Sequence, residues 1–172
     1  MAQLFTSLAK LGIALDWCIL DVALSSDRDP QLISPAELQH YAAELLGAGT
    51  NDEVLPLAVL SPGDIEETRA VASDLAAQSN CDHQRALSVL FLVDVDRWAS
   101  THTASDSTAA ISELVSLFAK QQSTATAPAA IQSWIDDTID PATFWSADGF
   151  EALHTAIVGW IDGERVRLSC SE

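Results

Sequence analysis

The stretch SPAELQHYAAELLG, residues 34–47, decides the fold class of this 172-residue chain. Ser34 and Glu37 have the spacing of a capping box, and Pro35 occupies the first helical position, where its missing N–H costs nothing. The apolar residues that follow have the spacing of one helix face: Leu38, Tyr41, Ala42, Leu45 and Leu46. Gly47 and Gly49 then end the predicted helix.

Helical periodicity recurs on both sides of this stretch, whereas the apolar–polar alternation of strands is nearly absent. Asp16 can cap an apolar helix over residues 17–24, and the run SPGD at 61–64 repeats the helix-start pattern. The second of these helices should bury Ile65, Ala72, Leu75 and Ala76. Further helices are predicted at residues 85–98, 109–120, 128–139 and 149–161. The sequence thus predicts an all-α single domain over 1–172, a bundle or stack of hairpins of about seven to eight helices.

Three segments are less regular. Pro56 lies too deep for a helix capped by residues 50–53, so one or two irregular turns are expected there. The run LSVLFLV at 87–93 reads as helix, with a buried strand as the alternative. Residues 100–108 and 121–127 are rich in Ser, Thr and Ala and are expected to be exposed loops.

The charge balance limits the classes of partner. The chain carries 25 Asp and Glu against 8 Lys and Arg, a formal net charge of -17. Nucleic acid and anionic membranes are excluded as expected partners, because the basic residues are scattered singly over an acidic surface. A hydrophobic fraction of 48% excludes a disordered acidic tail. Two readings of the charge stay open: it keeps the protein soluble, or it attracts a basic partner.

The expected location is the cytoplasm. Residues 1–10, MAQLFTSLAK, lack the basic start and continuous apolar run of a secretory signal, and no apolar run approaches the roughly 20 residues that span a bilayer. Cys18, Cys81 and Cys170 are far apart and odd in number, which is typical of reduced thiols. We expect Cys18 to be buried and Cys170 to lie in a frayed end.

No complete catalytic or metal-binding motif is present. The chain lacks a Gly-x-Ser-x-Gly elbow, a His-Glu-x-x-His motif, a Cys-x-x-Cys pair, a calcium loop and a phosphate-binding glycine loop. His40, His83, His102 and His154 lie in unrelated settings and are expected at the surface or at helix edges. Glu151 and His154 have the Glu-x-x-His spacing of di-iron bundles, but such sites need a second copy. The sequence predicts no enzyme, no metal and no cofactor, and a dispersed active site is the catalytic alternative.

Acidic residues crowd two predicted helix ends. One group precedes Pro141 and the other follows residue 161, where the helix dipole and mutual repulsion each disfavour anions by roughly 0.3–1 kcal/mol. Trp145 and Trp160 stand close by as candidate exposed anchors, and tryptophan is enriched at interface hot spots. The predicted partner-binding residues are Asp136, Asp137, Asp140, Trp145, Asp148, Asp162 and Glu164. The alternative is that Trp134, Trp145 and Trp160 belong to the core and the acids to a solvated edge.

Two further acids lie in the middle of the chain. Asp94 and Asp96 follow the apolar run at 87–93 and precede Arg97, with which either can pair. A solvated helix face is expected for both.

The order of several segments resembles a known family. The segments are residues 15–17, 33–41, 57–60, 111–118, 128–134 and 153–168, beginning LDW, ISPAELQHY, LAVL, ISELVSLF, PAAIQSW and LHTAIVGW. They resemble a bacterial family of small helical proteins thought to be immunity proteins of polymorphic toxin systems. Ala127-Pro128 stands where that family has a tyrosine–proline junction. The resemblance implies a protein that neutralises a toxin, and it brings no catalytic residues.

The expected function is therefore cytoplasmic inhibition of a basic toxin domain, by acidic side chains around apolar anchors and without catalysis. The protein would be a monomer or a weak homodimer. The alternative is a helical adaptor or regulatory protein that acts through self-association or a host partner. The first function predicts an association rate that falls with salt, and the second predicts a stable oligomer with weak salt dependence.

Overall fold

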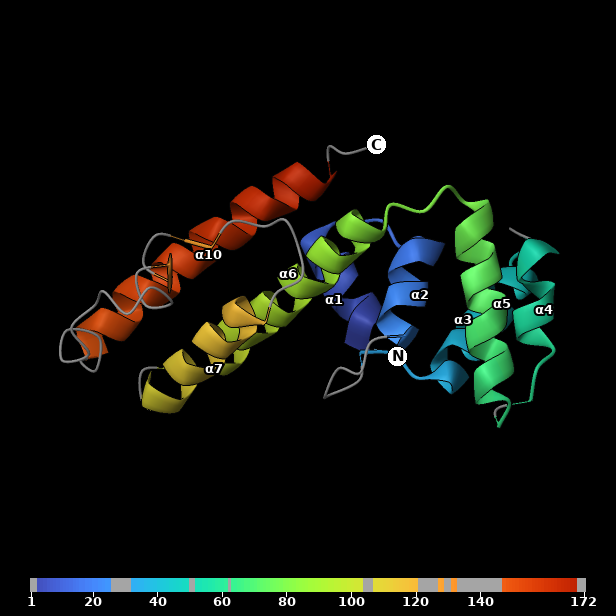
Figure 1. Ribbon diagram of the computed structural model, residues 1–172, viewed down its shortest axis with the longest axis horizontal. Coiled ribbons are helices and arrows are strands. Elements are labelled where there is room, and N and C mark those ends of the chain that lie inside the picture. Colours follow the sequence, from blue (N-terminus) through green and yellow to red (C-terminus); the bar gives the residue numbers. More distant parts are fainter. Residues whose placement is uncertain are drawn as a thin grey trace. The chain divides into compact units, whose positions relative to one another are not determined.

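The structure is a computed structural model that describes residues 3–25, 32–49, 52–61, 63–103, 107–120, 127–128, 131–132 and 147–169. These residues contain eight α-helices, one 3-10 helix and no β-strand, which confirms the all-α prediction (Figure 1). The chain divides into two compact units, Met1–Leu87 and Ser88–Glu172. The division falls within one helix, and the prediction of a single domain stays a prediction.

Helix α3 (Pro35–Gly47) begins with the predicted capping box. The Glu37 N–H donates to Ser34 Oγ at 3.2 Å, and the Ser34 N–H donates to Glu37 Oε2 at 3.1 Å. The helix ends at Gly47, and Gly49 follows in the left-handed region with φ 67°. The start and the end of α3 are therefore confirmed, because both are fixed by local backbone chemistry.

The first unit is built around α2 (Trp17–Ser25), which is the predicted central helix. The Ile19 N–H donates to Asp16 Oδ1 at 2.8 Å, so Asp16 caps the helix as predicted. Six of its residues are buried: Cys18, Ile19, Leu20, Val22, Ala23 and Leu24. Helix α2 packs against α5 (Ile65–Gln78), and α1 (Gln3–Leu11) is joined to the segment before α3 by the Leu4 N–H, which donates to the Leu32 carbonyl.

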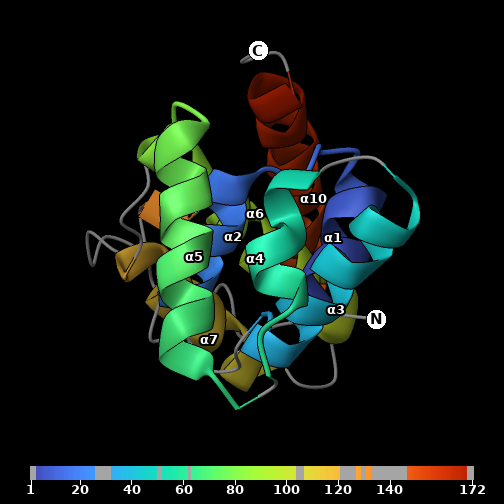
Figure 2. The ribbon, with the colours of Figure 1, turned by 90° about the vertical axis from the view of Figure 1, so that its right-hand side faces the viewer.

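The connection between α3 and α5 contains no long helix, and irregular turns were predicted there. It consists of the 3-10 helix η1 (Asp52–Val54) and the four-residue helix α4 (Leu55–Ala58). A new helix starts at Leu55, so Pro56 lies in a first turn, where proline is tolerated. Figure 2 shows α4 and α5 side by side in this unit, in agreement with their contacts.

Helix α5 begins later than its start pattern predicts. The Ser61 N–H donates to Asp64 Oδ2 at 3.2 Å and the Asp64 N–H donates to the Ser61 carbonyl at 2.9 Å, so these residues form a turn before the helix. The first helical residue is Ile65, and its side chain is exposed, so the prediction that it is buried is wrong. A residue at the start of a helix has no preceding turn of the same helix to cover it. Ala72, Leu75 and Ala76 are buried as predicted.

A buried polar link joins α3 to α5. The Gln39 side-chain amide donates to Thr68 Oγ1 at 2.8 Å and to the Ser61 carbonyl at 3.0 Å. The Thr68 hydroxyl donates in turn to the Asp64 carbonyl at 2.8 Å. Both side chains are buried, and each has hydrogen-bonding partners, which is the condition for placing polar groups inside a fold.

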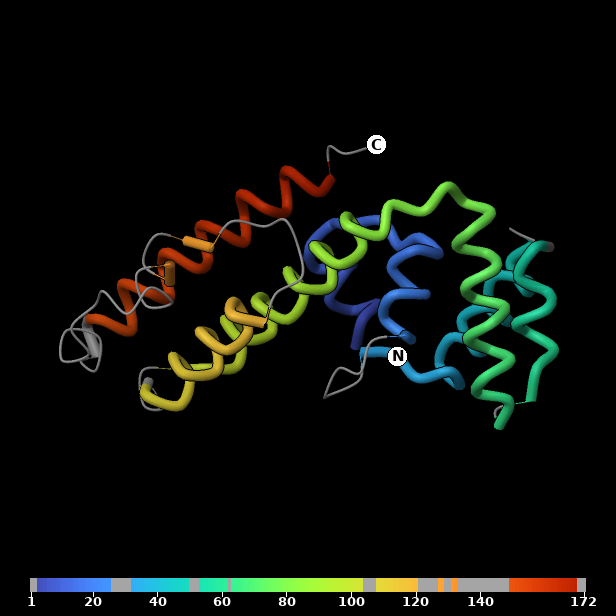
Figure 3. Tube along the Cα trace, viewed as in Figure 1, coloured from blue at the N-terminus to red at the C-terminus, as the bar shows by residue number. Residues whose placement is uncertain are grey.

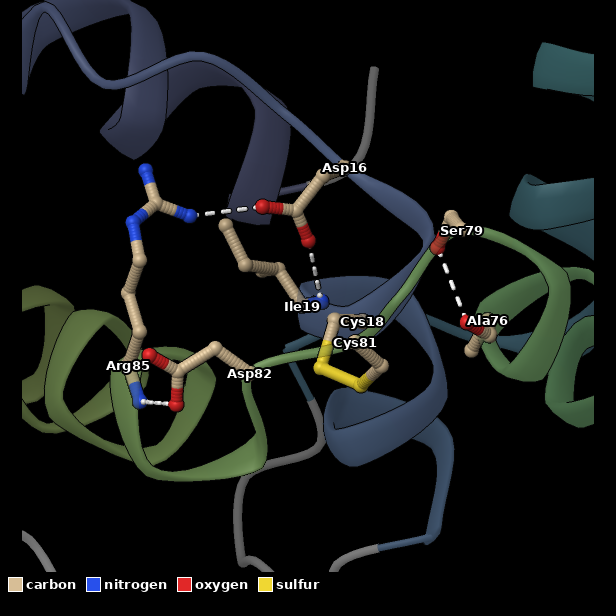
Figure 4. The surroundings of a disulfide bond; sticks show 8 residues. All are labelled: Asp16, Cys18, Ile19, Ala76, Ser79, Cys81, Asp82 and Arg85. Atoms are coloured by element: carbon tan, nitrogen blue, oxygen red, sulfur yellow. Dashed lines mark hydrogen bonds and ion pairs between the residues drawn. A yellow bond between two sulfur atoms is a disulfide. The ribbon is translucent and has the colours of Figure 1, made fainter. Parts of the chain in front are cut away.

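A disulfide bond between Cys18 and Cys81 ties α2 to the turn that follows α5 (Figure 4). The expectation of reduced thiols is therefore wrong for this pair, whereas Cys170 lies outside the described residues. The cause is tertiary: α2 packs on α5, and Asn80, at φ 54°, turns the chain at the end of α5 so that Cys81 meets Cys18. The burial predicted for Cys18 is confirmed.

An ion pair lies beside the disulfide. Arg85 Nη1 lies 2.6 Å from Asp16 Oδ2, while the Arg85 N–H donates to Asp82 Oδ1 at 2.9 Å (Figure 4). Asp82 thus caps α6 (His83–Thr101), which begins two residues before the helix predicted over residues 85–98. One arginine links the cap of α6 to the cap of α2.

The second unit contains α6 from Ser88 onward, α7 (Ser107–Ala119) and α10 (Ala147–Ser169). Figure 3 traces α6 as one continuous helix through residues 87–93. The prediction of a helix is therefore confirmed for this run, and the alternative of a buried strand is wrong. The Trp98 indole N–H donates to the Ala110 carbonyl at 2.7 Å and holds α7 on α6. Phe91 and Phe118 pack edge to face with ring centroids 4.9 Å apart. This helix trio has its own aromatic core.

Most of the second predicted loop, at 121–127, and most of the predicted helix at 128–139 lie outside the described residues. The first predicted loop is shorter than expected, since α6 extends to Thr101 and α7 begins at Ser107. None of the helices in the described part of the chain has the length and hydropathy that crossing a membrane requires.

Candidate functional site

The predicted partner-binding residues fall into two groups. Asp136, Asp137, Asp140 and Trp145 lie outside the described residues. Asp148 lies in the first turn of α10, and its side chain is also outside the description. An acid in the first turn of a helix is favourably placed against the helix dipole, so Asp148 does not share the unfavourable position argued for the other acids.

Asp162 and Glu164 are described, and they do not lie at a helix end. Helix α10 continues past the predicted end at residue 161 to Ser169. The acids are tolerated in mid-helix because each has an arginine three residues on: Asp162 Oδ1 lies 3.6 Å from Arg165 Nη2, and Glu164 Oε2 lies 2.6 Å from Arg167 Nη2. Asp162 is exposed, whereas the Glu164 side chain is only 15% exposed. Of the two, Asp162 has the carboxylate that a partner can reach.

Trp160 is half-buried and packs on two core aromatic rings. Its ring packs edge to face on Phe91 and on Phe118, at centroid distances of 5.9 Å and 5.3 Å. The half-buried tryptophan is thus the third member of the aromatic core of α6, α7 and α10. These ring contacts favour the alternative in which Trp160 belongs to the core.

Three of the histidines make separate local contacts in the described ranges. The distance between His154 Nε2 and the Ala99 carbonyl oxygen is 2.8 Å, and the His154 ring lies near Trp98. His154 therefore bridges α10 and α6. His102 lies 3.1 Å from a Glu113 carboxylate oxygen, and His40 lies 3.4 Å from one of Glu44. Within those ranges no three His, Cys, Asp or Glu side chains gather as a metal ion would need.

The two acids in mid-chain differ from the expectation of a solvated face. Asp94 pairs with Arg97 at 3.4 Å, as the sequence allowed, but its side chain is only 13% exposed. Asp96 is buried, with 9% of its surface exposed. The expectation of solvation is wrong because α6 is covered on several sides in the second unit, as its aromatic contacts with α7 and α10 show.

Each arginine that the structure describes pairs with a carboxylate. The pairs are Arg69 with Glu66, Arg85 with Asp16, Arg97 with Asp94, Arg165 with Asp162, and Arg167 with Glu164. Each of these five arginines is therefore neutralised by a neighbouring carboxylate, and the five form no basic cluster. With a net charge of -17, the field around the protein is set by the remaining carboxylates.

One short stretch of chain exposes both apolar and acidic side chains, and the sequence reasoning missed it. Leu55 is 51% exposed, Val59 69% and Ile65 45%, while Val54 and Leu57 on the other side of α4 are fully buried. Exposed acids occur in the same short stretch of chain. We call this the α4–α5 surface, made of Leu55, Val59 and Ile65 with Glu53, Asp64, Glu66 and Glu67.

The signal for this surface is present in the sequence. Residues 54–60, VLPLAVL, are apolar throughout and have acids on both sides. A four-residue helix at the edge of a fold can bury only one of its faces, so an uninterrupted apolar run leaves aliphatic side chains outside. Three of the five large apolar residues that are exposed in the described part of the chain belong to this surface.

The described geometry offers ion pairs, a disulfide and a stretch that exposes acidic and apolar side chains. Such an arrangement can bind a basic protein through carboxylates and aliphatic contacts. Comparison with protein-family models, with curated proteins and with solved structures finds no match to this chain.

Proposed function

We propose that this protein is an immunity-type inhibitor that binds a basic toxin domain and neutralises it without catalysis. The observation that carries the proposal is the net charge of -17 on a folded helical chain. A globular protein needs far less charge to stay soluble, since a magnitude of roughly 2–8 suffices for a small domain. The excess of carboxylates is suited to attracting and orienting a cationic protein.

The pairing of the arginines supports this proposal. Five of the 8 basic residues are held against carboxylates within the chain, so few cations are left to repel a basic partner. The exposed carboxylate of Asp162 and the acids predicted at Asp136, Asp137 and Asp140 remain the candidate contacts in the second unit. They await a test by substitution.

Affinity capture from the native cell tests the proposal. The tagged protein is bound at low salt and eluted by stepwise salt, and the co-purifying protein is identified. We expect one basic protein that salt releases, and an association rate that falls steeply as ionic strength rises, because screening shortens the range of attraction. An association rate that does not change with salt contradicts the mechanism.

The cytoplasmic location predicted from the sequence is part of this proposal, and the disulfide weighs against it. Cytosolic proteins rarely keep structural disulfides, because their thiols are held reduced. Alkylation of thiols in intact cells, before lysis, separates the two outcomes. If Cys18 and Cys81 are free thiols, the prediction of a cytoplasmic location stands. If they are bonded, the protein acts in an oxidising compartment.

A helical adaptor that self-associates is the second candidate, and one observation favours it. Val158 and Val166 of α10 are 41% and 58% exposed and lie about two turns apart. Exposed aliphatic residues at this spacing can pack against a helix of a second copy. The mass in solution separates the candidates: a stable dimer that persists in high salt favours the adaptor.

A further inference from the structure

We propose that the α4–α5 surface is the docking site for a basic amphipathic helix of the partner protein. This inference rests on the proposed function and names the surface and the chemistry of its occupant. It starts from Leu55 and Val59, which lie one turn apart on the outer side of α4. Ile65 follows at the start of α5, beyond the turn that leads out of α4.

The exposed apolar side chains of this surface are not part of the buried core. Val54 and Leu57 already fill the inner side of η1 and α4, and neither has any exposed surface. Leu55 and Val59 are more than half exposed, so removing their side chains would leave the core unchanged. Single exposed apolar residues are common on proteins, but three within eleven positions form a continuous sequence feature that a partner can bury.

The charge of this region selects the occupant. Residues 41–68 contain six carboxylates, Glu44, Asp52, Glu53, Asp64, Glu66 and Glu67, and no Lys, Arg or His. Two residues that flank this range pair with members of the set: His40 lies 3.4 Å from Glu44, and Arg69 lies 3.2 Å from Glu66. Apolar side chains that lie among carboxylates match a helix that carries an aliphatic stripe flanked by Lys and Arg. Long basic side chains can cover apolar surface while their charged ends reach the acids.

The same charge excludes a second copy of this chain as the occupant. A symmetric dimer brings the same patch of both subunits together, so each carboxylate of the surface would face the carboxylates of its twin. Like charges placed opposite one another at an interface cost several kcal/mol. A basic segment of another protein is the occupant that relieves this repulsion.

The test uses a synthetic amphipathic peptide of Leu and Lys with the apolar residues on one helix face. It is added to the full, isotope-labelled chain, and backbone amide shifts are followed by NMR. We expect perturbed amides within residues 53–67, and we expect Leu55→Ser/Val59→Ser to weaken binding by on the order of tenfold or more. A peptide of the same composition in shuffled order, without an apolar face, should bind much more weakly.

The matched control is Ala152→Ser/Ala156→Ser, which changes two exposed apolar residues that lie one turn apart on α10. It should bind the peptide within about twofold of the wild type, and a second variant, Glu66→Gln/Glu67→Gln, should weaken binding and flatten its salt dependence. Shifts spread over the whole protein, or equal binding of both peptides, would overturn the proposal. So would unchanged binding by the Leu55→Ser/Val59→Ser variant.

The two proposals fail in different ways. If capture from cells yields no basic partner, the immunity-type function is wrong, while the peptide experiment still decides whether this surface takes a basic helix. If a captured basic partner binds the Leu55→Ser/Val59→Ser variant as tightly as the wild type, the function stands and the docking site is wrong. Far-UV circular dichroism of each variant verifies that the fold is intact.

Discussion

Tyr41 is the residue whose chemistry the fold changes most clearly. It lies on α3, and its ring packs on Phe5 of α1 at a centroid distance of 4.7 Å. Burial raises the pKa of the Tyr41 hydroxyl above its ordinary value of 10.0, because the phenolate is less well solvated there. The neutral form is therefore favoured in the folded state.

This shift predicts an alkaline loss of stability. A raised folded-state pKa means that the contribution of Tyr41 is fully present below pH 10 and is lost as pH rises through the folded-state pKa. Tyr41 is the only tyrosine, so tyrosinate absorbance reports it alone. We expect the native protein to titrate at higher pH than the same protein in denaturant. Equal midpoints for the two would show that burial does not act on this group.

Other single residues show why burial is difficult to predict from sequence. Asp96 is flanked by apolar residues and by Arg97, a context that equally fits a wet helix edge. Its burial depends on the helices that cover α6, and those are distant in the sequence. Trp160 is a similar case, because its contacts with Phe91 and Phe118 join three separate helices. The chemistry of a side chain determines whether it prefers to be buried, and the packing of neighbouring elements determines whether it is buried.

At the scale of elements, helix starts were predictable where their caps are local. Asp16, Ser34 and Asp82 each accept a hydrogen bond from a backbone N–H three residues later, so the motif and the structure are the same chemistry. The start of α5 was predicted too early, because Ser61 and Asp64 bond to each other in a turn instead of opening the helix. A cap motif fixes a local bond and does not always fix the helix boundary.

Helix ends and pairings between elements were less predictable. The acids after residue 161 pointed to a helix end, but Arg165 and Arg167 compensate them and α10 continues. The Cys18–Cys81 bond joins residues 63 apart and follows from the packing of α2 on α5. The α4–α5 surface likewise became visible only when one face of α4 was seen to be covered. For the candidate site, composition predicts a basic partner, and the tertiary structure adds the exposed side chains on which the proposed surface rests.

At the scale of the whole molecule, the question is whether the two compact units unfold together. Each unit has fewer than 90 residues, a size at which a single core gives limited stability. Helix α6 contributes its first residues to one unit and the rest to the other. Unfolding of either unit would fray a helix that the other one needs. We therefore expect one cooperative transition, in keeping with the single domain predicted over 1–172.

The disulfide provides a way to measure this coupling, because it lies entirely within the first unit. By the chain-entropy relation, a closed loop of this length stabilises the folded state by about 4 kcal/mol, so reduction should lower Tm by on the order of 10 °C. The reductant should have no effect on Tm of the Cys18→Ala/Cys81→Ala variant. A Trp17→Phe background leaves tryptophans only after residue 87, so fluorescence then reports the second unit.

If the chain is one cooperative domain, reduction shifts the fluorescence transition of the second unit as far as the circular dichroism transition of the whole protein. The reason is that destabilising any part of a two-state domain lowers the stability of all of it. If the units are independent, the fluorescence transition stays in place while only the first unit melts earlier. That outcome would replace the single domain by two, and a partner bound at the α4–α5 surface would then stabilise residues 1–87 alone.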